Sequence, residues 1–201
     1  MSNEQDTEVK KQTVYSVMGR ILNFLNSPHE QRSRPRYLAA IRNSMDKNLE
    51  DSADVWPVLF PFVPREFLKD GTLNCQLTFQ EKALLVALQL YAVGQQGLGK
   101  VSDNEENISF GCSLRRIKDG NSASLDRRFN TMLTATTYDE FVYHLRQIFR
   151  LAKSKESFSV NFSKLADDLF RHQNGANKNV CLRWAKDYYR PASDEEDNNR
   201  T

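Results

Sequence analysis

Apolar residues recur at intervals of three and four along most of this 201-residue chain, and this spacing constrains the fold more than any other feature. In residues 9–25, for example, the set of Val14, Met18, Ile21 and Leu25 would line one side of a helix. No window longer than about four residues alternates polar and apolar side chains convincingly, as a half-buried strand does. The sequence therefore predicts an all-α protein of about eight or nine helices.

The helix predicted to follow Thr78 is apolar on nearly every side. Thr78 and Glu81 have the spacing of a capping box, which places the start of the helix at this threonine. From residue 83 to residue 93 the side chains are almost all apolar. A helix of that kind is usually buried on all sides, so this segment is predicted to be the central helix of the fold.

A second capping box, at Thr137 and Glu140, precedes the clearest amphipathic helix of the chain, over residues 138–155. By contrast, three prolines interrupt the aromatic-rich segment 56–68. Because proline disrupts helix interiors, we expect only short turns or helical stubs there.

The chain divides at a loop rich in glycine at its start and in acidic residues at its end. We predict that residues 96–107 link an N-terminal helical lobe, residues 9–95, to a C-terminal helical lobe, residues 108–190. The two ends, residues 1–8 and 191–201, are polar and acidic, and both are predicted to be disordered. The fold class is thus two small helical bundles joined by a loop.

The formal net charge of +2 conceals an uneven distribution of charge. Residues 9–110 hold 12 basic and 11 acidic residues, whereas residues 111–190 hold 15 basic and 8 acidic residues. The second half is therefore a basic module with a net charge of +7. Such a surplus indicates a polyanionic partner.

The basic residues of this module gather on helix flanks. On the helix predicted over 138–155, Arg146, Arg150 and Lys153 follow the spacing i, i+4, i+7 beside the apolar face. The last predicted helix has a similar layout, with Arg183, Lys186 and Arg190. Stripes on several helices at once fit contact with a phosphate backbone rather than base readout, although solvated helix faces alone would also explain any single stripe. Trp184 and Tyr188 lie on the apolar side of the last helix, which favours core packing over base stacking.

One candidate for nucleotide chemistry is weak. Residues 94–100 read Gly-Gln-Gln-Gly-Leu-Gly-Lys and match part of a phosphate-binding loop. The next residue should be Ser or Thr to hold magnesium, but it is Val101. The motif should also follow a strand, whereas a helical run precedes it here. We interpret this segment as a flexible linker.

Metal and disulfide chemistry are not indicated either. The histidines His29, His144 and His172 lie in separate segments without ligand spacing. Asp167 and Asp168 are adjacent and would point about 100° apart on a helix, so they would not share a metal. The cysteines are far apart and odd in number, which excludes a zinc ribbon or a disulfide framework: Cys75, Cys112 and Cys181. We expect no cofactor. No apolar run approaches the ~18 residues of a membrane span. We expect a cytoplasmic protein, in which the thiols stay reduced.

Four runs in the C-terminal half carry a family resemblance through their order and spacing. They are Ile108-Ser-Phe-Gly-Cys-Ser-Leu-Arg-Arg116, Ser124-Leu-Asp-Arg-Arg-Phe129, His144-Leu-Arg-Gln-Ile-Phe-Arg-Leu-Ala-Lys-Ser-Lys155 and Leu182-Arg-Trp-Ala-Lys-Asp-Tyr-Tyr189. Together they resemble the CasB family, the small subunit of the type I-E CRISPR effector complex Cascade. The resemblance covers roughly residues 76–190 well and residues 10–75 more loosely.

The resemblance implies a non-catalytic, all-helical protein with two small lobes and no cofactor. It also implies that two copies lie along the backbone subunits that carry the guide RNA, in a complex with a large subunit. In that family the basic faces help to hold the hybrid of guide RNA and target DNA. They also stabilise the displaced non-target strand of the R-loop. This task needs non-specific affinity for a sugar–phosphate backbone, because guide pairing supplies the sequence reading.

Carried over residue by residue, the resemblance implies a set of basic residues that contact nucleic acid. They are Arg42, Arg115, Arg116, Arg127, Arg128, Arg146, Arg150, Lys153, Lys155 and Arg183. We expect most of them to face nucleic acid. The others are expected to contact acidic residues of a neighbouring subunit, or to brace the lobe through Asp126 or Asp187.

Two other classes of protein remain open from the sequence. A helix-turn-helix regulator would read duplex DNA with one helix, for which residues 122–134 are the only tempting candidate. Because the basic residues are spread over four helices, a single recognition helix is not favoured. A protein-only helical adaptor would use the same charge for subunit docking. An enzyme is least favoured, because no nucleophile, base and orienting residue can be assembled from the sequence.

Overall fold

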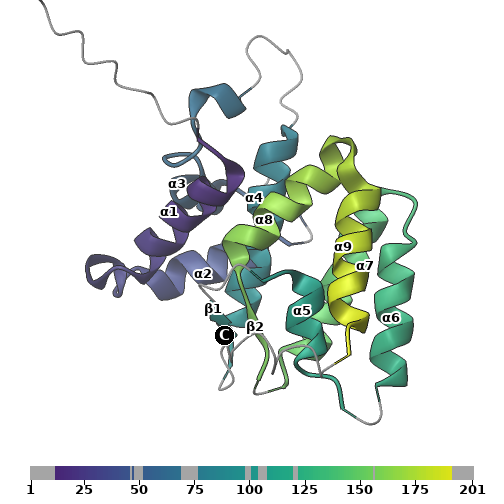
Figure 1. Ribbon diagram of the computed structural model, residues 1–201. Coiled ribbons are helices and arrows are strands. Elements are labelled where there is room, and N and C mark those ends of the chain that lie inside the picture. Colours follow the sequence, from purple (N-terminus) through teal and green to yellow (C-terminus); the bar gives the residue numbers. More distant parts are fainter. Residues whose placement is uncertain are drawn as a thin grey trace, which may run out of the picture.

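The computed structural model confirms the all-α prediction (Figure 1). It describes residues 12–45, 47, 52–68, 77–97, 101–103, 108–119, 122–155 and 157–191. The predicted disordered ends lie outside these residues, apart from Pro191, and so does part of the predicted linker. None of the helices in these ranges is both long and apolar enough to cross a membrane.

Helices account for nearly all the regular structure in the described ranges. The α-helices are α1 (Val14–Asn26), α2 (Arg34–Asn43), α3 (Trp56–Leu59), α4 (Phe79–Gly94), α5 (Phe110–Arg115), α6 (Ala123–Leu133), α7 (Tyr138–Ala152), α8 (Phe162–Arg171) and α9 (Asn177–Tyr189). Shorter helical pieces are η1 (Pro28–Glu30), η3 (Ala53–Val55), η4 (Arg65–Phe67) and η5 (His172–Ala176). The stubs predicted for the proline-rich segment are confirmed as α3 and η4. A parallel pair of two-residue strands, β1 (Ser102–Asp103) and β2 (Ser159–Val160), is the one departure from helix there.

Helix α4 is the buried central helix that its composition predicts. Every residue from Ala83 to Gly94 is buried, and α1, α2, α7 and α8 pack around it. Its capping box is also confirmed. The hydroxyl of Thr78 accepts from the backbone N–H of Glu81 at 3.2 Å, and the Glu81 carboxylate accepts from the backbone N–H of Thr78 at 2.8 Å.

The second predicted capping box is only half formed. The hydroxyl of Thr137 accepts from the backbone N–H of Glu140 at 3.2 Å, as expected. The Glu140 carboxylate, however, bonds the backbone N–H of Thr136, at 2.8 Å, and the Thr136 hydroxyl. The Glu140 carboxylate bonds Thr136 more closely because this residue offers it two donors at one position. These hydrogen bonds, the backbone one first, lower the pKa of the Glu140 carboxyl.

Helix α8 comes from the second half of the chain but packs closely against α1 and α4, which come from the first half. The buried apolar side chains accordingly form one cluster that runs from α1 to α9. The boundaries of the two lobes predicted from the sequence remain a prediction.

The C-terminal helices pack around α9. Trp184 and Tyr188 of α9 are 0% and 1% exposed, so the prediction that they pack in the core is confirmed. Helix α5 lies so close to α9 that a Cβ on Gly111 would stand 2.1 Å from the carbonyl oxygen of Trp184. Only glycine fits this crossing.

Candidate nucleic-acid interface

The hairpin of α6 and α7 presents exposed arginines on the side that faces away from α9. Each helix turns its apolar face inward: the ring of Phe141 in α7 lies 5.8 Å from that of Trp184, and the ring of Phe129 in α6 lies 4.2 Å from that of Tyr188. Residues on the opposite side of each helix, such as Arg127 and Arg150, therefore point outward, and Arg128 is exposed beside Arg127. We call these three arginines the hairpin face.

The arginines of the hairpin face are unpaired within the described part of the chain. None of the three donates a side-chain hydrogen bond or forms an ion pair there, and all three are exposed. Their guanidinium groups therefore keep their donors for a partner. Guanidinium is well suited to phosphate, since it offers two parallel N–H donors in one plane.

The other two basic residues predicted on the flank of α7, Arg146 and Lys153, contact α4 instead. Nη2 of Arg146 donates to Oε1 of Gln89 in α4 at 2.6 Å, and the amide of this buried glutamine reaches Ser44 after α2. Lys153 donates from Nζ to the carbonyl oxygens of Val93, at 2.9 Å, and Gln96, at 3.0 Å. The regular spacing along α7 therefore includes one outward arginine, Arg150, between two side chains that contact α4.

Three cations gather at the carboxyl end of α4, two from α2 and one from the end of α7. Besides Lys153, Nη1 of Arg42 donates to the carbonyl oxygen of Ala92 at 3.3 Å. Arg34 donates from Nη2 to the side chains of Tyr91, at 3.0 Å, and Gln95, at 3.1 Å. Cations stabilise the last turn of a helix by binding carbonyls that have no partner inside the helix. Burial lowers the pKa of the Lys153 ammonium, and the nearby charge of Arg42 lowers it further.

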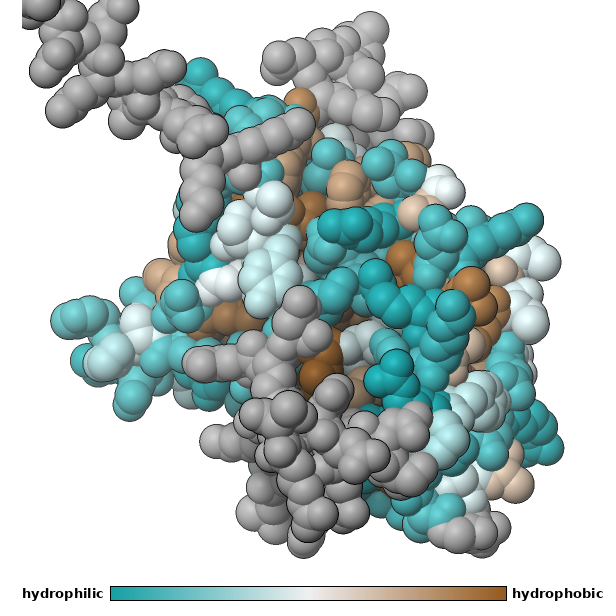
Figure 2. Space-filling model, viewed as in Figure 1, coloured by the Kyte–Doolittle hydropathy of each residue, from teal (hydrophilic) through white to brown (hydrophobic). Residues whose placement is uncertain are grey.

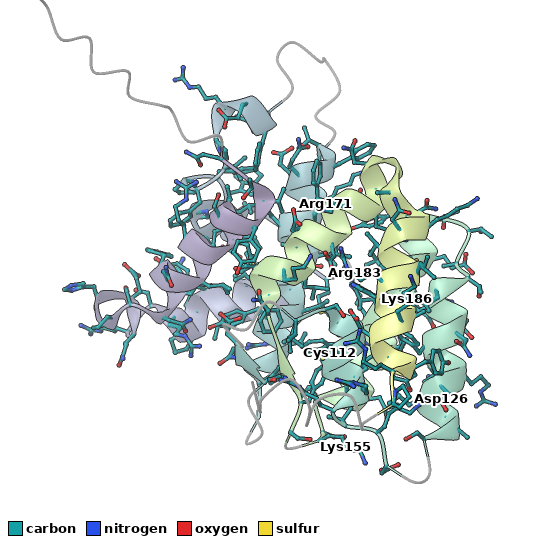
Figure 3. The ribbon with its side chains drawn as sticks, viewed as in Figure 1. Cys112, Asp126, Lys155, Arg171, Arg183 and Lys186 are labelled. Atoms are coloured by element: carbon teal, nitrogen blue, oxygen red, sulfur yellow. The ribbon has the colours of Figure 1, made fainter. Side chains whose placement is uncertain are left out.

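Arg183, which Figure 3 labels, is braced by a buried carboxylate. Its Nη2 donates to Oδ1 of Asp168, in α8, at 2.5 Å. Asp187 instead accepts from the hydroxyl of Ser109, and Asp126 accepts from Tyr188. The sequence did not indicate Asp168 as the partner of Arg183, because the two residues lie on separate helices, α8 and α9.

The Asp168 side chain is 0% exposed, and its carboxylate accepts from three donors. Besides Arg183, Nζ of Lys164 reaches it at 2.5 Å and Nε1 of Trp184 donates to it at 2.7 Å. Its neighbour Asp167 pairs with Arg171 at 2.7 Å, and its carboxylate also lies 4.0 Å from Nζ of Lys164, so the two carboxylates share this lysine. No group of three metal-ligating side chains occurs in the described residues.

The basic residues of α9 lie on the opposite side of the molecule from the hairpin face. Because Phe141 and Trp184 meet in the core, the outward side of α9 points away from the outward side of α7. Figure 2 shows the side that carries α8 and α9, which hydrophilic side chains cover in large part, and Figure 3 labels Arg183 and Lys186 there. The basic stripes of the C-terminal module therefore do not merge into one surface.

The remaining predicted residues lie near the base of α6. Lys155 pairs with Asp119 at 3.0 Å, and Lys118 pairs with Asp126 at 3.0 Å. Arg115 approaches the sulfur of Cys112 at 3.8 Å, and Arg116 is exposed. Both arginines have interactions with other residues. Nucleic-acid contact by any of these side chains remains a prediction.

The structure bears on two other sequence features. Gly94, the first glycine of the weak phosphate-loop motif, is the last residue of α4, whereas a phosphate-binding loop precedes its helix. His144 is half-buried on α7, 4.0 Å from Glu140, as expected of an ordinary surface histidine.

Arg34 was not among the predicted nucleic-acid-binding residues, although its spacing from Arg42 indicated a shared helix face. Arg34 and Arg42 stand eight residues apart with Leu38 between them, which places all three on one face of α2. Gln89 was also missed. A single glutamine inside the apolar run of α4 indicates a buried polar contact.

Comparison with known proteins identifies the family. The profile of the family described as CRISPR-associated protein Cse2 matches residues 37–189, most of the chain. The chain belongs to the Cse2 family. Cse2, also called CasB, is the small subunit of the type I-E Cascade, so the family expected from the sequence runs is confirmed. The match begins at the middle of α2 and so includes Arg42.

Individual Cse2 proteins agree with this assignment. The CRISPR-associated protein Cse2 of Thermus thermophilus is 28% identical over 178 residues, which cover 89% of this chain and 93% of the relative. The crystal structure of CasB from Thermobifida fusca has a TM-score of 0.62 at 20% identity and covers 88% of this chain and 96% of that one. CasB from M. ruber also has a TM-score of 0.62, at 19% identity, with 95% and 100% covered. These structures share the fold of this chain.

Proposed function

We propose that this Cse2 protein binds nucleic-acid strands through their backbone, without sequence preference, and so stabilises the R-loop of Cascade. The strands are the hybrid of guide RNA and target DNA and the displaced non-target strand. The observation that carries this proposal is the hairpin face, where Arg127, Arg128 and Arg150 are exposed and unpaired within the described residues. Backbone contacts by such side chains supply affinity that does not depend on sequence.

The Cse2 family is a structural subunit of Cascade and is generally non-catalytic. We propose that this chain likewise acts without catalysis and without a cofactor. Its partners would be the backbone and large subunits, a second copy of itself, the guide RNA and both DNA strands. Guide pairing reads the target in such complexes, so the small subunit needs only to hold strands in place.

The proposal is tested by reversing the charge of the hairpin face in the assembled complex. We expect R127E/R128E/R150E to enter Cascade normally and to reduce R-loop stability at least tenfold, measured as the fraction of target duplex opened over a titration of complex. The matched control is K178E/K186E/R190E. It reverses three exposed cations of α9 on the opposite side and changes the net charge equally.

The outcomes separate the competing functions. If the hairpin variant opens duplex as the wild type does, the hairpin face does not bind nucleic acid, and a protein-only adaptor is favoured. If the isolated chain instead prefers one duplex sequence strongly in a binding titration, a helix-turn-helix reader is favoured and the non-specific role is wrong.

A further inference from the structure

A pocket of about 600 Å³ opens between α2 and the carboxyl end of α4. Its volume falls within the ~300–1,000 Å³ range that is common for small-ligand sites. The lining combines cationic, amide and apolar side chains, and it includes no acidic residue. The lining residues are Asn26, Gln31, Arg34, Pro35, Leu38, Arg42, Gln95 and Gln96.

Positive charge converges on this pocket without a carboxylate among its lining residues. Arg34 and Arg42 stand in its wall. Lys153 joins them at the rim, where it donates to the carbonyl oxygen of Gln96, and its ammonium is close enough to Arg42 for the two charges to repel. The carbonyls at the end of α4 offset part of this charge. An anion in the pocket would offset the rest.

Hydrogen-bond donors remain in the pocket after the internal contacts are made. Of the Arg42 guanidinium, only Nη1 has a partner among the described residues, and that bond is long at 3.3 Å. Its Nη2 and Nε therefore keep N–H groups for an oxyanion. Nε of Arg34 also has no hydrogen-bond partner there, although that atom is buried.

The rest of the lining suits a heterocyclic base beside the anion. Pro35 and Leu38 give an apolar wall. The side-chain amides of Gln31 and Gln96 make no hydrogen bond within the described residues, and each can both donate and accept. A base offers the same combination, with a flat apolar face and an edge of donors and acceptors.

We infer that this pocket binds one nucleoside monophosphate unit, with the phosphate on Arg42 near Arg34 and Lys153 and the base beside Pro35, Gln31 and Gln96. This inference adds a binding site to the proposed function. It rests on that function for the expectation that the nucleotide unit belongs to a bound strand. Arg150 and Lys153 lie three residues apart on α7, so a strand on the hairpin face can lead to the pocket rim. A free nucleotide has the same chemistry and is the other source.

The test measures binding of deoxyadenosine monophosphate by the full chain in a calorimetric or fluorescence titration, with deoxyadenosine and inorganic phosphate as partial probes. Arg42→Gln removes a donor cation, and Gln96→Glu places a carboxylate in the pocket with little change in shape. We expect each variant to weaken nucleotide binding at least tenfold. The matched control, Arg36→Gln, changes an exposed arginine of the same helix that does not line the pocket. It should bind as the wild type does.

A second titration with a short oligo(dT) strand identifies the source. If the pocket variants weaken strand binding more than Arg36→Gln does while free nucleotide fails to bind, the unit belongs to a strand and the site stands. If both probes bind Gln96→Glu and Arg42→Gln as they bind the control, the site is refuted. Equal affinity for inorganic phosphate and for nucleotide would refute the base contacts.

Failure of the pocket is distinguishable from failure of the proposed function. The hairpin variant R127E/R128E/R150E leaves the pocket residues unchanged. Loss of strand binding in that variant alone supports the hairpin face; it overturns the pocket if deoxyadenosine monophosphate also fails to bind, and assigns the pocket to a free nucleotide if it binds. Loss of strand binding in the pocket variants alone supports the pocket and overturns the hairpin face.

Discussion

Asp168 shows at the scale of one residue why basic side chains of the same type differ in what they can bind. Its buried carboxylate takes donors from Lys164, Arg183 and Trp184. Arg183 is therefore committed to an internal partner, although its side chain is 40% exposed. Arg150 has no such partner in the described residues and keeps its donors for a ligand.

We predict that Asp168→Ala lowers the free energy of unfolding by about 3 kcal/mol, because it leaves two cations and an indole N–H without their shared acceptor in the core. Denaturant unfolding of the purified chain measures this loss. Asp167→Ala is the control, since it removes the neighbouring, less buried carboxylate, whose close partner is the exposed Arg171, and it should cost about 1 kcal/mol or less. Equal losses for the two variants would contradict a special role for the buried carboxylate.

Asp126 links α6 to α9 and makes stability depend on pH. It accepts from the Tyr188 hydroxyl at 2.6 Å and pairs with Lys118 at 3.0 Å, and these contacts lower the pKa of its carboxyl below 3.8. A carboxyl whose pKa is lower in the folded state stabilises the fold above its unfolded pKa. That contribution is lost as the pH falls through the folded value.

We therefore predict that Asp126→Asn flattens the acid limb of the stability curve. The melting temperature of the wild type should fall more steeply below pH 3.8 than that of the variant. Tyr188→Phe, which removes the first of the two donors, should flatten the same limb in part. If the curves of wild type and Asp126→Asn stay parallel below that pH as well, Asp126 does not carry this dependence.

At the scale of the element, α7 shows what its sequence could and could not predict. The apolar spacing correctly predicted the helix, its buried side and the basic flank. It could not distinguish Arg146, Arg150 and Lys153, because the acceptors of the first and last belong to α4, far away in sequence. The same limit explains Arg183, whose acceptor lies in α8.

Lys153 contacts the end of α4 whereas Arg150 does not, and this difference leads to a prediction about stability. We expect Lys153→Met to lower the free energy of unfolding by about 1 kcal/mol, because it removes a charged donor from the last carbonyls of that helix. Arg150→Met, three residues away, should leave stability unchanged and should weaken strand binding instead. Thermal unfolding and a strand titration on both variants check the two effects. Equal loss of stability in both variants would contradict the assignment.

At the scale of the whole molecule, the +7 charge of residues 111–190 is divided between two opposite sides. The sequence predicted the amount of charge correctly, since counting needs no structure. It could not predict the division, which depends on Phe141 of α7 and Trp184 of α9 lying together in the core. A strand that follows the hairpin face therefore meets only part of the surplus.

The salt dependence of strand binding measures how much of that surplus a strand meets. Each phosphate neutralised on a single strand contributes about −0.7 to the slope of log K against log salt concentration. We predict that R127Q/R128Q/R150Q reduces the magnitude of this slope by about 2, because three phosphate contacts are lost. K178Q/K186Q/R190Q removes the same charge from the opposite side and should leave the slope unchanged. Titrations of oligo(dT) at several salt concentrations give both slopes. Equal reductions would mean that the charge of the whole chain, rather than the hairpin face, attracts the strand.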